Sequence, residues 1–130
     1  MRFALTLLLS FALTAPAPAA EDLPSLDERI GRMLVVGFRG LDAAPKSAIV
    51  RTIRDQHIGG VILFDRDVPT ESATRNLRSP QQLRALTRSL QEAAPYPLLI
   101  AVDQEGGRVN RLKLRHGFRI EPAAELAAML

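Results

Sequence analysis

The chain has 130 residues, of which 47% are hydrophobic and 24% charged, an ordinary composition for a globular protein with one modest core. Cysteine is absent, which excludes a disulfide framework and thiolate metal sites. Although the isoelectric point is near 10.2, the formal net charge is only +3. The sequence has no dense basic block and few aromatic residues, which argues against nucleic acid as a partner.

Residues 1–20 have the three parts of a secretory signal peptide. Arg2 provides a positive start, Phe3–Leu13 is an apolar run, and small residues precede a cleavage site near Ala20. A membrane anchor is the alternative, but the apolar run is shorter than the roughly 20 residues that a spanning helix needs. The sequence therefore predicts an exported protein, periplasmic or extracellular, whose residues 21–130 form one partial domain with no stable membrane span.

Helices and strands are expected to alternate along the rest of the chain. A capping box from Ser25 to Glu28 starts a short helix, and the apolar segment Met33–Phe38 follows as the first strand. Asp42 and Pro45 suit the start of a second helix.

The second helix is expected to end at His57, where a cation is favoured by the helix dipole. Val61–Phe64 is the second apolar strand. Residues 68–78 are polar and rich in helix breakers, so they are interpreted as a long loop.

A third helix begins with three local signals, an N-cap, a proline at the first position and a capping box, at Ser79, Pro80 and Gln82. Its apolar stripe is formed by Leu83, Leu86, Leu90 and Ala93. The run Leu98–Val102 then predicts a third strand, buried on both faces as in parallel sheets.

Strands that alternate with helices predict an α/β fold with a parallel sheet. Right-handed crossovers would bring the carboxyl ends of all three strands to one face, where ligands bind in such folds. The charged residues that follow the strands would converge there: Arg39, Asp65, Arg66, Asp67, Asp103, Glu105, Arg108 and Arg111.

Three segments carry a resemblance to glycoside hydrolase family 3: IGGVILFDRD, SPQQLRALTRSLQ and PLLIAVDQEGGRVNRL. They are most similar to the β-N-acetylhexosaminidase branch of that family. The resemblance implies the N-terminal portion of a (β/α)8 TIM-type barrel, with about three βα units present. It also implies a retaining glycosidase that works through a covalent glycosyl-enzyme, with N-acetylglucosamine-containing glycans or cell-wall fragments as substrate and no cofactor.

The same resemblance implies that Asp103 accepts hydrogen bonds from sugar hydroxyls and that Arg111 helps to hold the sugar. From the residues alone, Asp103 could instead cap the next turn, and Arg111 could pair with Asp103 and orient it. Glu105 and Arg108 are interpreted as structural, for example as a pair with each other. The glycines at 106–107 are expected to serve the backbone geometry of a sharp turn.

The remaining polar candidates are interpreted as ordinary surface residues. Asp65, Arg66 and Asp67 are expected to form a solvated charged loop, although they could border the same cleft. His116 lies in a basic loop without a carboxylate beside it and is expected to be exposed. Two histidines without cysteine have no metal-ligand spacing, so no metal site is predicted.

The family's Lys-His motif, its acid/base histidine and its nucleophilic aspartate have no counterpart in this sequence, and they are expected to lie beyond Leu130. A (β/α)8 barrel also needs about 200 residues or more. We therefore expect an N-terminal fragment that is inactive and poorly folded alone, with its third strand an exposed apolar edge. Two alternatives stay open, a β-glucosidase of the same family and a non-catalytic sugar-binding remnant.

Overall fold

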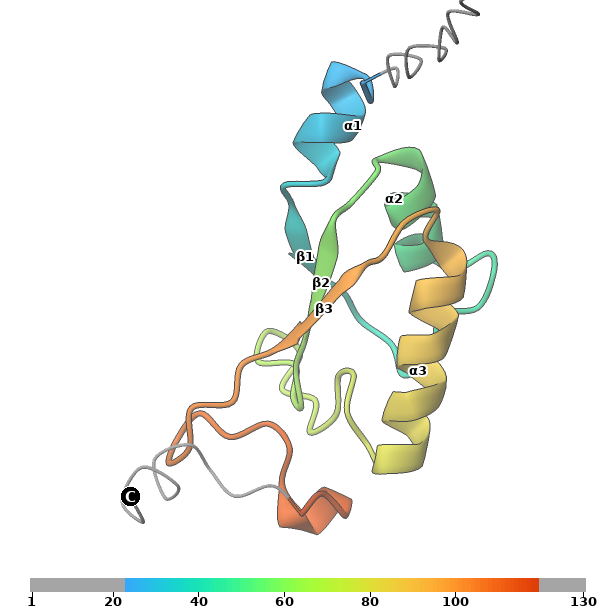
Figure 1. Cartoon of the computed structure of the whole chain (residues 1–130). Coiled ribbons are helices and arrows are strands. Elements are labelled where there is room, and N and C mark those ends of the chain that lie inside the picture. Colours follow the sequence, from blue (N-terminus) through green and yellow to red (C-terminus); the bar gives the residue numbers. More distant parts are fainter. Residues whose placement is uncertain (1–22, 120–130) are drawn as a thin grey trace, which may run out of the picture.

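The computed structural model describes residues 23–119. The predicted signal peptide lies outside the described residues, and so does the segment from Pro122 to Leu130, whose alanines and leucines predict the start of a further helix. The elements in chain order are α1 (Leu26–Gly31), β1 (Val35–Gly37), α2 (Ala48–Asp55), β2 (Gly60–Leu63), α3 (Pro80–Ala93), β3 (Leu99–Val102) and the short 3-10 helix η1 (Leu114–His116) (Figure 1). Within this range no helix is both long enough and apolar enough to cross a membrane.

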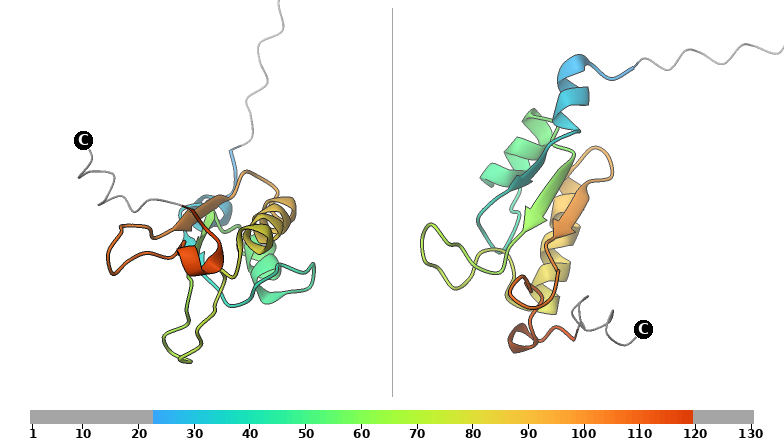
Figure 2. Two further views of the ribbon diagram at one scale, coloured as in Figure 1. Left: turned by 90° about the horizontal axis from the view of Figure 1, so that it is seen from below. Right: turned by 90° about the vertical axis from the view of Figure 1, so that its left-hand side faces the viewer.

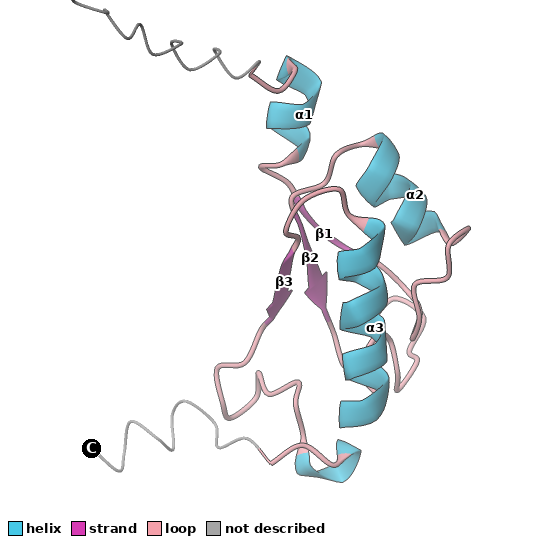
Figure 3. Ribbon diagram, turned by 45° about the vertical axis from the view of Figure 1, so that its right-hand side comes forward, coloured by secondary structure: helices cyan, strands magenta, loops and turns pink. Residues whose placement is uncertain are grey.

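The three strands form a parallel sheet in the order β1-β2-β3, as the alternation of strands and helices predicted. Val61 of β2 pairs with Val36 on one side and with Ile100 on the other. Helices α2 and α3 pack against each other over one face of this sheet (Figure 3). The described fold is thus a piece of layered α/β structure, one sheet face of which is covered by helices.

The core lies between the sheet and these two helices. Val61 and Leu63 of β2 are buried against apolar residues of α2 and α3, among them Ile53, Leu86 and Leu90. β2 is the most buried strand because it has a partner strand on each side.

The prediction that β3 is buried on both faces is wrong for the described residues. Leu99 is 58% exposed, and the other residues of β3 are only partly buried. One cause is that the described helices cover only one face of the sheet (Figure 3). The other is that β3 pairs with β2 along one edge, while no described strand covers its other edge. The exposed apolar edge that was expected for this strand is therefore present.

Two of the three predicted helix starts are confirmed. Ser25 and Glu28 form a reciprocal capping box at α1, and Ser79 accepts a hydrogen bond from the backbone N–H of Gln82 at α3. The start of the second helix was placed too early, because Ser47 rather than Asp42 is its N-cap.

Gln82 does not close the capping box on Ser79 that was predicted. Its side-chain oxygen accepts from the backbone N–H of Arg78, and its amide nitrogen donates to the backbone carbonyls of Leu41 and Asn76. The side chain therefore ties the start of α3 to the two loops that follow β1 and β2.

The end of α2 lies within two residues of the prediction. The helix ends at Asp55, and His57 lies beyond it with a positive φ of 53°. Next to it, the backbone N–H of Gly59 donates to the carbonyl oxygen of Gly31 at 3.0 Å. A Cβ atom at Gly59 would lie only 1.9 Å from the carbonyl oxygen of Arg32, so α1 sits directly on this segment.

Candidate functional site

The loops that follow the three strands gather at the carboxyl end of the sheet, as predicted. Residues 38–47 follow β1, residues 64–79 follow β2 and residues 103–119 follow β3. In Figure 2 these loops lie together at the end of the sheet opposite to α1. Side chains from all three loops can therefore contribute to one site.

Asp65 is the most deeply buried carboxylate of this site, with no exposed surface. Its Oδ1 lies 3.3 Å from Nη1 of Arg111, and its Oδ2 lies 2.5 Å from Nζ of Lys113 and 3.9 Å from Nη2 of Arg115. Burial alone would raise the pKa of Asp65, but the hydrogen bond and charge of Lys113, with the charge of Arg111, outweigh it and hold that pKa below its ordinary value. The interpretation of Asp65 as part of a solvated loop was wrong, because cations distant in sequence cover it.

Arg111 connects Asp65 to Asp103. Its Nη2 atom lies 3.6 Å from Oδ2 of Asp103, while Nη1 contacts Asp65. Its guanidinium carbon lies 5.7 Å from the centre of the Phe64 ring. The Nε atom is buried and has no hydrogen-bond partner among the described residues. The ion pair with Asp103 that the residues alone had suggested is therefore present.

Both residues of this pair remain accessible. The side chain of Asp103 is 34% exposed and that of Arg111 is 19% exposed. A carboxylate is an acceptor only and a guanidinium is a donor only, so together they offer both kinds of hydrogen bond to a polyhydroxylated ligand. Their assignment as ligand-binding residues stays a prediction.

The turn between Asp103 and Arg111 is held by Gln104. The side-chain oxygen of Gln104 accepts from the backbone N–H groups of Arg111 and Leu112, at 2.9 and 3.1 Å, and its amide donates to Oδ1 of Asn110 at 2.9 Å. The glycines at 106–107 have φ values of 86° and 55°, so they serve the backbone geometry that was expected of them. No role was predicted for Gln104, although its place between the charges of Asp103 and Glu105 was a signal that could have found it.

Glu105 and Arg108 do not form the pair that was suggested for them. Both side chains are exposed, and no ion pair joins them within the described residues. The backbone N–H of Glu105 donates to the carbonyl oxygen of Val109 at 2.8 Å, which is a contact of the turn itself.

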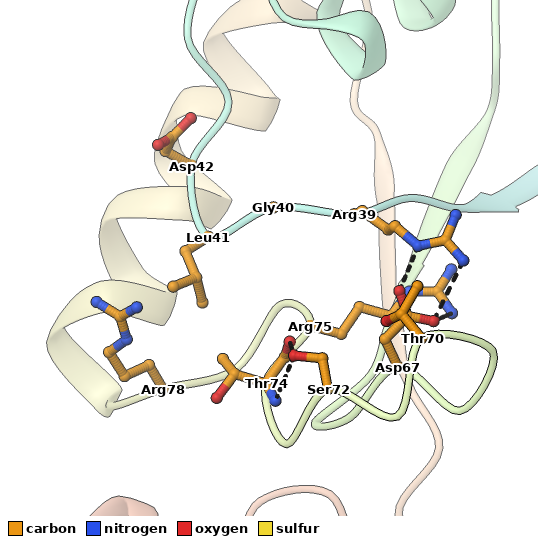
Figure 4. Close-up of a pocket in the computed structure, with 10 residues that line it drawn as sticks. All are labelled: Arg39, Gly40, Leu41, Asp42, Asp67, Thr70, Ser72, Thr74, Arg75 and Arg78. Atoms are coloured by element: carbon orange, nitrogen blue, oxygen red, sulfur yellow. Dashed lines mark hydrogen bonds and ion pairs between the residues drawn. The ribbon is translucent and has the colours of Figure 1, made fainter.

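A second charged cluster lies beside the first, between the loops after β1 and β2. Asp67 is buried and forms an ion pair with Arg39, whose hydrogen bond holds the pKa of Asp67 below its ordinary value. Arg75 also points toward Asp67, with Nη1 4.0 Å from Oδ1 (Figure 4). These loops line an open cavity of about 560 Å³. The solvated-loop interpretation was therefore wrong for Asp67 too, whereas Arg66 is exposed as expected.

The two loops around this cavity are joined by Asn76, which is completely buried. Its Oδ1 accepts from the backbone N–H of Phe64 at 3.0 Å, and its Nδ2 donates to the carbonyl oxygens of Phe38 at 3.2 Å and Gly40 at 3.0 Å. One side chain thus fixes the carboxyl ends of β1 and β2 relative to each other.

His116 is not exposed as predicted, but half-buried. Its Nε2 accepts a hydrogen bond from Nε of Arg115 at 3.1 Å, and its Nδ1 is buried without a partner among the described residues. Burial, and next the charge of Arg115, lower the pKa of His116 below its ordinary value. Residues 23–119 contain no group of three or more histidine or carboxylate side chains that could hold a metal ion, and the absence of a metal site stays a prediction.

The catalytic nucleophile and the acid/base group were expected beyond Leu130. That position lies outside the described residues, which end at Arg119, so the geometry of this site does not test the expectation and it stays a prediction.

Comparison with known families and proteins gives a consistent result. The family model described as "Glycosyl hydrolase family 3 N terminal domain" matches residues 25–125. The β-hexosaminidase of Alkalilimnicola ehrlichii is 46% identical over 90 residues, which are 68% of this chain and 23% of that protein. The β-hexosaminidase of Methylobacillus flagellatus is 51% identical over 77 residues, 58% of this chain and 19% of that protein. The chain thus spans about a fifth of the length of these relatives.

Solved structures show the same similarity. A glycoside hydrolase family 3 β-N-acetylglucosaminidase from Paenibacillus sp. strain FPU-7 matches 70% of this chain and 16% of its own, with 38% identity and a TM-score of 0.57. A fungal multi-domain β-N-acetylglucosaminidase of that family matches 81% of this chain and 12% of its own, with 36% identity and a TM-score of 0.61.

Proposed function

The chain belongs to glycoside hydrolase family 3, and from that membership we propose that its described residues form part of the sugar-binding site of an enzyme that removes terminal β-linked N-acetylhexosamine. The N-terminal domain of the family is a TIM-barrel-like α/β fold, and the three parallel strands with their helices are part of such a barrel. The names of the similar proteins, β-hexosaminidase and β-N-acetylglucosaminidase, support this substrate class.

The observation that carries the proposal is the accessible pair of Asp103 and Arg111 at the carboxyl end of β3. In barrels of this type, the carboxyl ends of the strands carry the active site. Asp103 accepts charge-assisted hydrogen bonds from sugar hydroxyls, and the planar guanidinium of Arg111 donates to sugar oxygens. The partner of this site is thus a carbohydrate.

We assign no bond-breaking role to Asp65, Asp67 or Asp103. A retaining glycosidase needs a free, ionised carboxylate as nucleophile and a proton donor, and a carboxyl group can be that donor only if its pKa is raised. The pKa values of Asp65 and Asp67 are instead lowered, and both groups are held by cations. Asp103 is paired with Arg111. The covalent step is therefore assigned to none of these three residues.

Export is also part of the proposal. It is supported by the positive start, apolar run and small residues of positions 1–20. A substrate from cell-wall fragments is chemically in keeping with an enzyme in the periplasm or outside the cell.

The first experiment tests binding with the full chain. Saturation-transfer NMR is expected to show contact with N-acetylglucosamine, and Asp103→Ala is expected to weaken the affinity at least about 10-fold because it removes charged hydrogen bonds. Asp55→Ala, an exposed carboxylate at the end of α2, is the matched control and should bind as the wild type does. Equal binding by Asp103→Ala and the wild type would overturn the proposed site.

The second experiment tests hydrolysis in a chimera. The matching 90-residue segment of the Alkalilimnicola ehrlichii relative is replaced by that of this chain. The chimera is expected to release nitrophenol from a β-N-acetylglucosaminide and not from a β-glucoside, and to lose activity with Asp103→Ala. Preferential cleavage of the glucoside would favour the β-glucosidase alternative. Sugar binding by the chain combined with a chimera that cleaves neither substrate would favour the non-catalytic alternative.

A further inference from the structure

We propose that Asp65 is a positioning residue of the sugar site, which holds the guanidinium of Arg111 apart from Asp103 so that both can bind the sugar. The inference rests on the proposed function, because it assigns Arg111 and Asp103 to the sugar. Asp65 itself has no exposed surface, so it acts through its neighbours and does not touch the ligand.

The geometry places Asp65 between two loops. It follows β2, whereas its partners Arg111 and Lys113 follow β3. Its two oxygens are divided between them, since Oδ1 contacts Nη1 of Arg111 and Oδ2 contacts Nζ of Lys113. The buried carboxylate of Asp65 therefore fixes the position of Arg111, which follows β3, relative to the carboxyl end of β2.

The guanidinium of Arg111 has two carboxylates within reach and is shared between them. Nη1 lies 3.3 Å from Asp65, while Nη2 lies 3.6 Å from Asp103, a longer contact that leaves the Asp103 oxygens available. A guanidinium and a carboxylate preferentially form two parallel hydrogen bonds. Without Asp65, Arg111 would form two parallel hydrogen bonds with Asp103. These bonds would occupy the Asp103 oxygens that accept hydrogen bonds from the sugar.

The charge of Asp65 is needed as well as its shape. Arg111, Lys113 and Arg115 all approach its oxygens, within 3.3, 2.5 and 3.9 Å respectively. Asparagine has almost the same shape but no charge, and its amide group would turn a donor toward one of these cations. In Asp65→Asn the three cations lose their shared carboxylate, and Asp103 is the carboxylate of this group that remains to attract them.

The test measures both sugar binding and the state of Arg111 in the full chain. Asp65→Asn is expected to weaken N-acetylglucosamine binding about 10-fold, which corresponds to the loss of one charged hydrogen bond between Asp103 and the sugar. The control Asp55→Asn is expected to leave the affinity unchanged. In an Arg111→Met background, adding Asp65→Asn is expected to cause no further loss, because the two residues act as one unit. Additive losses in this double-mutant cycle, or an unchanged affinity in Asp65→Asn, would overturn the proposal.

A second measurement reads the Arg111 guanidinium directly and does not need Asp65→Asn to fold. Nitrogen-15 NMR of the ligand-free wild type is expected to show slow rotation of this group. The slow rotation should persist in Asp103→Ala, where Asp65 still holds Nη1, whereas free rotation there would overturn the proposal. A wild-type chain that shows slow rotation but binds no N-acetylglucosamine would overturn the proposed function and leave the contact with Asp65 established.

Discussion

Replacing Asn76 by alanine tests whether one buried side chain holds the candidate site together. Three hydrogen bonds are lost, but the carbonyl oxygen of Phe38 keeps a partner because Nε of Arg75 also donates to it at 2.8 Å. Leaving the half-buried N–H of Phe64 unpaired costs about 2 kcal/mol, and losing the bond to the exposed Gly40 costs about 1 kcal/mol. We expect the free energy of unfolding to fall by about 3 kcal/mol.

Urea unfolding of the full chain, followed by circular dichroism, measures this loss as a shift of the transition midpoint at unchanged slope. Asn110→Ala is the matched control, because Asn110 is only partly buried and its side chain accepts one hydrogen bond, from Gln104. The control should lose less than about 1 kcal/mol. An Asn76→Ala variant as stable as the control would refute the assignment of Asn76 as the link between β1 and β2.

Two further predictions concern the ends of the sheet. Gly59→Ala is expected to destabilise the chain by about 3 kcal/mol or more, because the new Cβ would clash with the backbone of Arg32. The control Gly107→Ala has open space around its Cβ and should cost only about 1–2 kcal/mol, from its positive φ. Equal losses of the two variants in urea unfolding would contradict this. His116 has a lowered pKa in the folded state, so its protonation favours unfolding, and stability should fall as the pH drops below about 6.5. His116→Gln should remove that part of the loss between about pH 7.5 and 5.5, and an unchanged pH dependence would argue against the burial of His116.

The parts of the fold that depend on neighbouring residues could be predicted from the sequence. Ser25 and Ser79 each cap a helix through contacts within three residues, and the alternation of strands and helices led to a parallel sheet. The start of α2 could not be read in this way, because Asp42 and Ser47 are both suitable caps. Side chains distant in sequence decide between them, because Asn76 and Gln82 donate to the backbone carbonyls of Gly40 and Leu41, and the helix begins only after Ser47.

The candidate site shows the same limit. Asp103 and Arg111 share one short segment, and their proximity could be anticipated from the residues alone. Asp65 was interpreted as solvated because it begins a run of three charged residues after the second strand. Its burial depends on Lys113 and Arg111, which belong to another loop and supply the charge that makes burial tolerable. Only the pairing of β2 with β3 brings these cations to it.

The separation of Asp65 and Lys113 along the chain determines when the site can form during synthesis. Lys113 comes 48 residues after Asp65. At a synthesis rate of about 5–20 residues per second, the ribosome adds the lysine roughly 2–10 seconds after the aspartate. During this interval the carboxylate lacks the cations that cover it in the folded structure. The ion pairs around Asp65 in the proposed sugar site can therefore form only after β3 and the segment that follows it have left the ribosome.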